Sequence, residues 1–419
     1  MATKRKHDEN GDDFKAPKSK APRKFDFSKH PKRRIAVQFF YYGWNHDGLV
    51  QQVDSENTVE YHLMKALLKT CLIESWEKAD VTRCGRTDKG VSAFKQTMAL
   101  VVRSSDPTHP DVFWEEGTPE DVKNSYVNAQ ELNYVKMLNG VLPKSIRLFR
   151  WAPVEVKFNA RFDCTTRTYK YAFPCAGLNL SNMKLAGSYL EGSHDFSNFC
   201  QIDMNSQRLE QSYIRTIHSV KLTQRLDRSL DLDVDSRTCD DMDDGFLVSG
   251  SDHPRSNYQM AELTIVGSGF LWHMIRYIVT VLHEIGRGME KPELVKELLD
   301  LSKYPSRPHY TLASETPLCL FDCTYSIPEE KWICDRPAME AVVCNVQKEW
   351  AMYSSRGKML ENIINGLMDM NEDCRNSTKG FLEFVQDRPL PPKYVKFSHR
   401  PKCETLKEKR DKKAQKSEK

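Results

Sequence analysis

The sequence predicts an α+β fold, because extended and helical patterns alternate along most of its 419 residues without the regular spacing of parallel β-α-β units. The extended runs combine β-branched and aromatic residues, as in residues 34–41. The helical runs repeat apolar residues at intervals of three and four, as in residues 58–70. The length allows two or three domain-sized units.

Taken in chain order, the patterns predict individual elements. The continuous apolar run at 270–286 is too long for a strand and stops at Gly286, so we interpret it as a buried helix. The stretch 224–258 holds nine acidic and four basic residues, and we interpret it as an insertion between two strands of one hairpin. Strands are predicted at residues 34–41, 96–102, 169–173, 216–222, 259–266 and 318–325, and helices at 58–70, 129–138, 270–286, 292–301 and 342–370.

These elements group into five segments. Both ends are rich in lysine and punctuated by proline, a composition typical of disorder. We therefore expect a disordered basic tail at 1–32, an N-terminal α/β half at 33–145, a C-terminal α/β half at 146–328 that includes the acidic insertion 224–258, a helical C-terminal extension at 329–389, and a second disordered basic tail at 390–419.

The net charge of +4 conceals an uneven distribution. Residues 1–34 and 390–419 each carry a net charge of +7, so the body between them is acidic. Basic tails suit nucleic-acid contact or nuclear import, although a merely solvated end has the same composition. We expect a nuclear protein, and leave a cytoplasmic share open.

Several classes of function are disfavoured. No apolar run approaches the ~20 residues needed to span a bilayer, so we expect no membrane partner. The twelve cysteines are scattered without a C-x-x-C pair, which predicts reduced thiols and no metal site. A Walker loop and a dinucleotide fingerprint are missing from the sequence, so no cofactor is predicted.

The most informative stretch is residues 83–93, with the sequence RCGRTDKGVSA. It places two arginines, one lysine and two glycines around a single carboxylate, Asp88. Such a loop suits an anionic substrate and one nucleophilic or acid/base step. The alternative is a surface turn whose charges pair with each other.

Two further positions support a functional interpretation. Arg276 lies in the apolar run 270–286, where a guanidinium requires a buried carboxylate partner unless it extends to the surface. Asp88 is the candidate partner. Tyr169 follows basic residues on a predicted strand, which suits base stacking beside phosphates, although strand aromatics are more often core. His194, His273 and His283 lack ligand spacing and are interpreted as structural.

Residues 83–93 closely resemble the active-site motif of the TruA-type tRNA pseudouridine synthases. The stretches 158–162 (FNARF) with 167–171 (RTYKY), and 270–276 (FLWHMIR), resemble the second and third motifs of that family in the same order. Residues 42–48, 194–200, 316–323 and 332–335 resemble the branch that modifies positions 38 and 39 of the anticodon arm. The nearest alternative is the branch that acts on positions 27 and 28.

The resemblance implies two ferredoxin-like (RRM-like) halves whose antiparallel sheets join across a central basic cleft. Asp88 would be the catalytic residue, Arg86 would fill the gap left by the flipped uridine, Tyr169 would stack on the base, and Arg276 would pair with Asp88. The reaction would need no cofactor. The substrate would be the tRNA anticodon stem-loop, and the protein would be a homodimer. A non-catalytic RNA-binding or tRNA-folding module, or a structural protein that holds RNA with its tails, remains an alternative.

Overall fold

The computed structural model describes residues 25–126, 129–202, 209–224, 258–371, 374 and 377–417. Within them the fold is mixed α+β, with ten strands in one sheet ordered β4-β1-β3-β10-β6-β9-β8-β7, while β5 pairs with β1 and β2 with β3. Neighbouring strands are antiparallel except β3 and β10. The strands are β1 (Lys32–Tyr41), β2 (Thr82–Arg83), β3 (Ser92–Arg103), β4 (Val112–Phe113), β5 (Ile146–Pro153), β6 (Cys164–Pro174), β7 (Gly192–Asp195), β8 (Ile214–Gln224), β9 (Met260–Gly267) and β10 (Leu318–Tyr325).

The five predicted helices end close to the predicted residues, but three of them begin at Tyr134, Met274 and Arg336 instead of residues 129, 270 and 342. Thr58 caps the first of them by accepting a hydrogen bond from the Tyr61 amide. The described helices are α1 (Val59–Lys69), α2 (Glu120–Asn124), α3 (Tyr134–Asn139), α4 (Leu180–Ser188), α6 (Met274–Gly286), α7 (Leu294–Leu299), α8 (Arg336–Met370), α9 (Lys379–Gln386) and α10 (Leu406–Ser417). In this part of the chain, no helix is long and apolar enough to cross a membrane.

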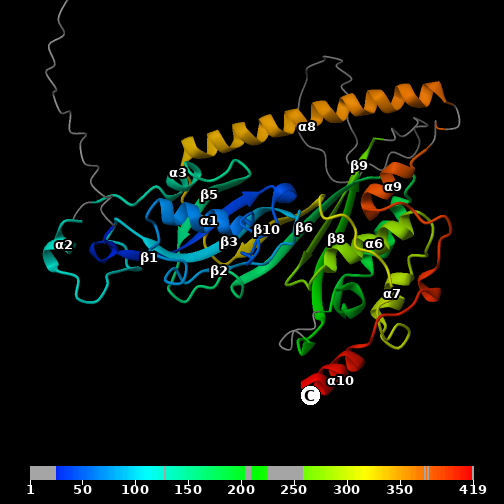
Figure 1. Ribbon diagram of the computed structural model, residues 1–419, viewed down its shortest axis with the longest axis horizontal. Coiled ribbons are helices and arrows are strands. Elements are labelled where there is room, and N and C mark those ends of the chain that lie inside the picture. Colours follow the sequence, from blue (N-terminus) through cyan, green and yellow to red (C-terminus); the bar gives the residue numbers. More distant parts are fainter. Residues whose placement is uncertain are drawn as a thin grey trace, which may run out of the picture.

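The sheet is shared by two halves that lie side by side (Figure 1). Strands β1, β3 and β5 with α1 and α3 enclose one hydrophobic core, and β6, β8 and β9 with α4, α6 and α7 enclose the other. The seam is the short parallel contact of β3 with β10, where Cys319 pairs with Ser92 and Leu320 with Ala93. Strand β10 continues antiparallel to β6, so it belongs to both halves.

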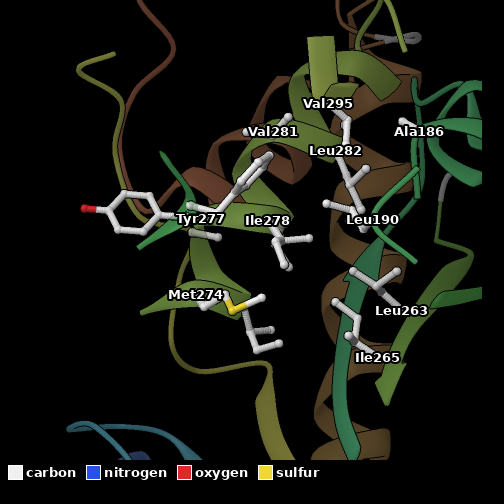
Figure 2. Packing of buried hydrophobic residues seen from close by; sticks show 14 of the residues in the cluster. Ala186, Leu190, Leu263, Ile265, Met274, Tyr277, Ile278, Val281, Leu282 and Val295 are labelled. Atoms are coloured by element: carbon white, nitrogen blue, oxygen red, sulfur yellow. The ribbon is translucent and has the colours of Figure 1, made fainter. Parts of the chain in front are cut away.

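Helix α6 is the centre of the C-terminal core. Twelve of its thirteen residues are buried, and the exception is Arg276. Figure 2 shows its apolar side chains facing those of the strands and helices around it, with labels on Ala186, Leu190, Leu263, Ile265, Met274, Tyr277, Ile278, Val281, Leu282 and Val295. The apolar run therefore forms the predicted buried helix, but only from residue 274; residues 270–273 lie before it.

Two predicted boundaries are wrong. Strand β5 pairs with β1 and buries Ile146, Leu148 and Trp151 in the N-terminal core, so the first half extends beyond residue 145. The described part of the 390–419 tail is ordered: Phe397 is fully buried in the C-terminal core and His309 donates its amide to the Pro401 carbonyl at 2.8 Å. A few aromatic residues anchor this segment despite its basic composition.

The acidic insertion and the N-terminal tail are described only in part, and Phe27–Lys29 of that tail form a short 3₁₀ helix, which differs from the predicted disorder. Strands β8 and β9 are antiparallel neighbours, as expected for a hairpin that carries the acidic insertion, and residues 225–257 of that insertion lie outside the described residues. So do residues 1–24 of the N-terminal tail, while β1 already begins at Lys32. The extension after residue 329 is helical, and its long α8 runs across both halves (Figure 1).

Candidate active site

The loop that carries Asp88 is held by a neighbouring segment of the same half, residues 43–49. Leu49 donates its amide to the Thr87 carbonyl at 3.1 Å, and Gly90 donates to the His46 carbonyl at 3.2 Å. A Cβ atom at Gly43 would lie 2.0 Å from the Val91 carbonyl oxygen, so only glycine allows this approach. The backbone of the loop is therefore fixed before any substrate binds.

Two cations of the loop pair with carboxylates other than Asp88. Arg83 pairs with the buried Glu60 of α1 at 2.6 Å, and Lys89 pairs with Asp47 at 2.9 Å. Arg86 is exposed. Arg83 and Lys89 thus pair with carboxylates outside the loop. This differs from the alternative of a surface turn whose charges pair with each other.

Asp88 instead receives its hydrogen bonds from the other half of the molecule. The Trp272 indole N–H donates to Oδ1 at 3.3 Å, and Nε2 of His273 lies 3.3 Å from Oδ2. Burial raises the pKa of Asp88, but the hydrogen bond and charge of His273, the Trp272 hydrogen bond and the nearby Arg276 charge together bring it below its ordinary value. With 36% of its side chain exposed, Asp88 is an ionised carboxylate open to a ligand.

The sequence predicts a structural role for His273, and the structure shows in addition that its side chain contacts Asp88. Its backbone is in the left-handed region at φ 61°, immediately before α6, which is uncommon for a residue with a Cβ. This conformation places Trp272 and His273 before the helix, with their rings 4.6 Å apart, where both side chains reach Asp88. Periodicity could not reveal this, because the apolar pattern continues through the loop into the helix.

Arg276 does not form the expected direct ion pair with Asp88. Its guanidinium donates to Glu315 at 2.7 Å and to the Ala313 carbonyl at 2.6 Å. The requirement for a carboxylate partner is confirmed, but the partner is Glu315. The Glu315 side chain also packs against Gly90, where an added Cβ would lie 2.5 Å from its Cγ. Arg276 thus reaches the Asp88 loop through Glu315.

Tyr169 lies on β6, where the two cores meet. Its ring packs edge-on against Phe270 at 5.1 Å, and burial raises the pKa of its hydroxyl. Among the described residues, no hydrogen bond or ring contact joins Tyr169 to Asp88. Phe270 precedes Trp272 and His273 by only two and three positions, so Tyr169 packs against the segment whose side chains reach Asp88.

Exposed cationic and aromatic side chains accompany these residues. Arg86 and Arg161 are exposed, and the Arg161 guanidinium lies 5.7 Å from the centre of the Phe162 ring. Phe162 is 79% exposed and Trp272 44% exposed. Such side chains can contact phosphates and stack on unpaired bases. The arrangement offers an ionised nucleophile or base beside groups that suit a nucleic acid.

Comparisons with known proteins agree with this chemistry. Residues 186–326 match a family model described as tRNA pseudouridine synthase. The chain is 54% identical to the probable tRNA pseudouridine synthase tag-124 of Caenorhabditis elegans, over 95% of this chain and 94% of that protein. It is 36% identical to the tRNA pseudouridine(38/39) synthase of Mus musculus, over 92% and 78% of the two chains. It is 35% identical to the tRNA pseudouridine(38/39) synthase of Saccharomyces cerevisiae, over 83% and 73%.

Proposed function

The chain belongs to the tRNA pseudouridine synthase family, and we propose that it is an isomerase that converts uridine to pseudouridine at positions 38 and 39 of the tRNA anticodon stem-loop. The observation that carries the proposal is Asp88, an accessible carboxylate kept ionised by Trp272 and His273 from the other half. Relatives named for positions 38 and 39 favour these uridines over positions 27 and 28.

The proposed reaction breaks the bond between C1′ and N1 of the uridine and forms a bond between C1′ and C5. The base detaches, rotates and rejoins, and the proton lost from C5 is balanced by one gained at N1. Asp88 acts either as a nucleophile at C1′ or as a base at C2′. Both routes need an ionised carboxylate, which agrees with the lowered pKa of Asp88.

Access to the uridine requires that it leave the base stack, which costs a few kcal/mol. We assign Arg86, exposed two residues before Asp88, to the gap that the flipped base leaves in the RNA. We assign Tyr169 to stacking on the flipped base, and its packing against Phe270 supports a fixed ring orientation. Arg276 is a positioning residue that acts on the loop through Glu315.

The proposed RNA surface is a basic cleft between two ferredoxin-like halves. The joined antiparallel sheet and the two separate cores support this architecture. Arg86 in the N-terminal loop and Arg161 in the segment before β6 supply exposed positive charge. We expect them to contact phosphates, which makes tRNA binding dependent on salt concentration.

The test of the function is the substitution Asp88→Asn, which removes the charge and keeps the shape. We expect pseudouridine formation at positions 38 and 39 of a tRNA transcript to fall at least ~10³-fold, with tRNA binding retained. Asp300→Asn is the matched control, since the exposed Asp300 carboxylate accepts hydrogen bonds from Ser302 in a surface turn. Turnover by Asp88→Asn at the control rate would contradict the proposed role of Asp88.

An inactive parent protein that still binds tRNA would favour the non-catalytic alternative. Modification at positions 27 and 28 would identify the sister branch.

We also propose that the protein is a homodimer whose contact surface includes α8. Apolar residues of this helix follow a heptad spacing, and Trp350 and Leu367 are 69% and 61% exposed in the described structure. The stripe consists of Val343, Val346, Trp350, Tyr353, Gly357, Leu360, Ile364 and Leu367. A second copy fits because a two-fold axis would pair the stripe with itself.

The oligomeric state tests this surface. Light scattering coupled to gel filtration should give the mass of a dimer for the parent protein and of a monomer for Trp350→Glu with Leu360→Glu. Ser354→Glu places the same charge at another exposed position of α8, outside the stripe, and should leave the dimer intact. A monomeric parent protein would contradict the proposal.

We propose nuclear localisation with a cytoplasmic share, on the basis of the basic clusters at residues 4–6 and 31–34. A fluorescent fusion of the full chain should concentrate in the nucleus. Replacing Lys4, Arg5 and Lys6 by alanine should shift it toward the cytoplasm, while an unchanged distribution would show that these residues do not direct import.

A further inference from the structure

Three cysteines that are distant in the sequence meet where the Asp88 loop approaches strands β6 and β10. The thiols of Cys84, Cys164 and Cys323 are buried, and their sulfur atoms all lie within 4.8 Å of one another. We propose that these three thiolates bind one zinc ion, which fixes the Asp88 loop to strands β6 and β10. This site is separate from the proposed isomerase chemistry, and it would be a structural centre.

Each ligand comes from a different element. Cys84 follows β2 and donates its amide to the Thr97 carbonyl of β3 at 2.9 Å. Cys164 begins β6, and Cys323 lies on β10, in register with Arg167 of β6. The metal would therefore join the N-terminal half, the first strand of the C-terminal half and the strand shared by both. Cys84 and Asp88 lie in one short loop, so the proposed zinc site is close to the Asp88 carboxylate.

The spacing of the sulfur atoms suits the metal. Zinc–sulfur bonds of about 2.3 Å place the sulfurs of a tetrahedral site roughly 3.8 Å apart. An upper bound of 4.8 Å for the three separations requires only a small contraction on binding. The Tyr325 hydroxyl lies beside the Cys84 thiol and donates to the Ala160 carbonyl at 2.6 Å, so the fourth position is open to its oxygen or to water.

The strongest support is the charge of Arg167. Its guanidinium donates to the carbonyls of Cys84, Arg161 and Ser268 at 3.2, 2.8 and 2.8 Å. In the described part of the chain, no carboxylate lies within 4 Å of it. Three neutral thiols would pack as small apolar groups and leave this cation without an anionic partner.

Charge balance also selects the ion. Three thiolates with Zn²⁺ carry a net charge of −1, which the single positive charge of Arg167 compensates. Copper(I), the other thiophilic ion common in proteins, would leave a net charge of −2 on the three thiolates and the metal. A disulfide between two of the cysteines would carry no charge. It would leave the third thiol without a role and Arg167 without an anionic partner.

Metal analysis of the purified full chain tests the proposal. Protein produced with added zinc and gel-filtered without chelator should retain one zinc ion per chain by mass spectrometry. Cys164→Ser and Cys323→Ser should each lose it. Cys319→Ser is the matched control, because Cys319 lies on the same strand β10 but outside the cluster, and it should retain the metal.

A second measurement does not depend on the folding of variants. Replacing zinc by Co²⁺ in the parent protein should produce the near-ultraviolet thiolate-to-cobalt absorption, and a strong zinc chelator should lower its melting temperature. Parent protein without stoichiometric zinc and without this absorption would overturn the proposal. So would zinc that both cysteine variants retain, or a disulfide between two of the three residues in the parent protein.

Discussion

The two halves of the molecule contribute differently to Asp88. The N-terminal half holds its loop with backbone contacts, through Leu49 to Thr87 and Gly90 to His46. The C-terminal half supplies side chains, Trp272 and His273, that set the charge state of the carboxylate. One half therefore fixes where the reactive group lies and the other fixes how it is ionised. The predictions below separate these contributions, in order of their expected effect on turnover.

The largest effect should follow the loss of His273. In His273→Ala, kcat should fall roughly 10²-fold, as for other single donors to an active-site anion. Because His273 lowers the pKa of Asp88, its loss should raise that pKa, so the acidic limb of the pH–rate profile should move to higher pH. Steady-state kinetics between pH 4 and 8 would measure both changes.

The control for this prediction is His273→Gln, whose side-chain amide can still donate a hydrogen bond to Asp88 and should restore part of the rate. An acidic limb that stays in place in His273→Ala would mean that the C-terminal half does not control the ionisation of Asp88.

Trp272→Phe should have a smaller effect, about tenfold in kcat, because one neutral hydrogen bond of 3.3 Å is lost while His273 remains. The aromatic face is kept, so the dissociation constant for tRNA should change little. Trp272→Ala separates the two roles, since it should weaken tRNA binding as well. Equal kinetics for the phenylalanine variant and the parent would show that the indole N–H is not needed.

How far the sequence could predict this site depends on the range of each interaction. Asp88 is recognisable because its loop concentrates charge and glycine within eleven residues. Burial of the helix around Arg276 correctly implied a carboxylate partner, but Glu315 lies 39 residues away in a loop, where no periodicity marks it. The His273 contact depends on a left-handed backbone conformation that residue type does not indicate.

Prediction of the fold from the sequence is limited in the same way. The alternation that identifies strands is local, and it identified most of them. Which sheet edge a strand joins is not local, so the predicted boundary at residue 145 places residues 146–153 in the C-terminal half, although β5 pairs with β1 of the N-terminal half. Cys84, Cys164 and Cys323 are separated by 80 and 159 residues, and only the pairing of β6 with β10 and the approach of the loop bring them together.

Glu315→Gln should change turnover by only a few fold, because Glu315 acts on the loop through packing with Gly90 and through Arg276. Its neutralisation leaves the mostly buried Arg276 without its anion, so the free energy of unfolding should fall by about 1–3 kcal/mol. Chemical denaturation would measure the loss. An unchanged stability together with a large loss of kcat would instead place Glu315 in the chemistry itself.

The smallest effect on turnover at neutral pH should come from His283, which lies in α6 and tests the rigidity of the C-terminal half. Burial lowers its pKa from 6.5 to about 3, with a smaller contribution from Arg287. Below pH 6.5 the unfolded chain binds a proton that the folded chain excludes, so this group destabilises the fold increasingly as the pH falls toward 3. Between pH 7.5 and 4.5 the loss should be about 3 kcal/mol. His283→Asn, which cannot titrate, should lose less stability over the same range.

Hydrogen exchange should show acid-induced opening of α6 before α1 in the parent protein. Earlier opening of α1 would mean that acid weakens the half that holds the loop, rather than the half that ionises Asp88.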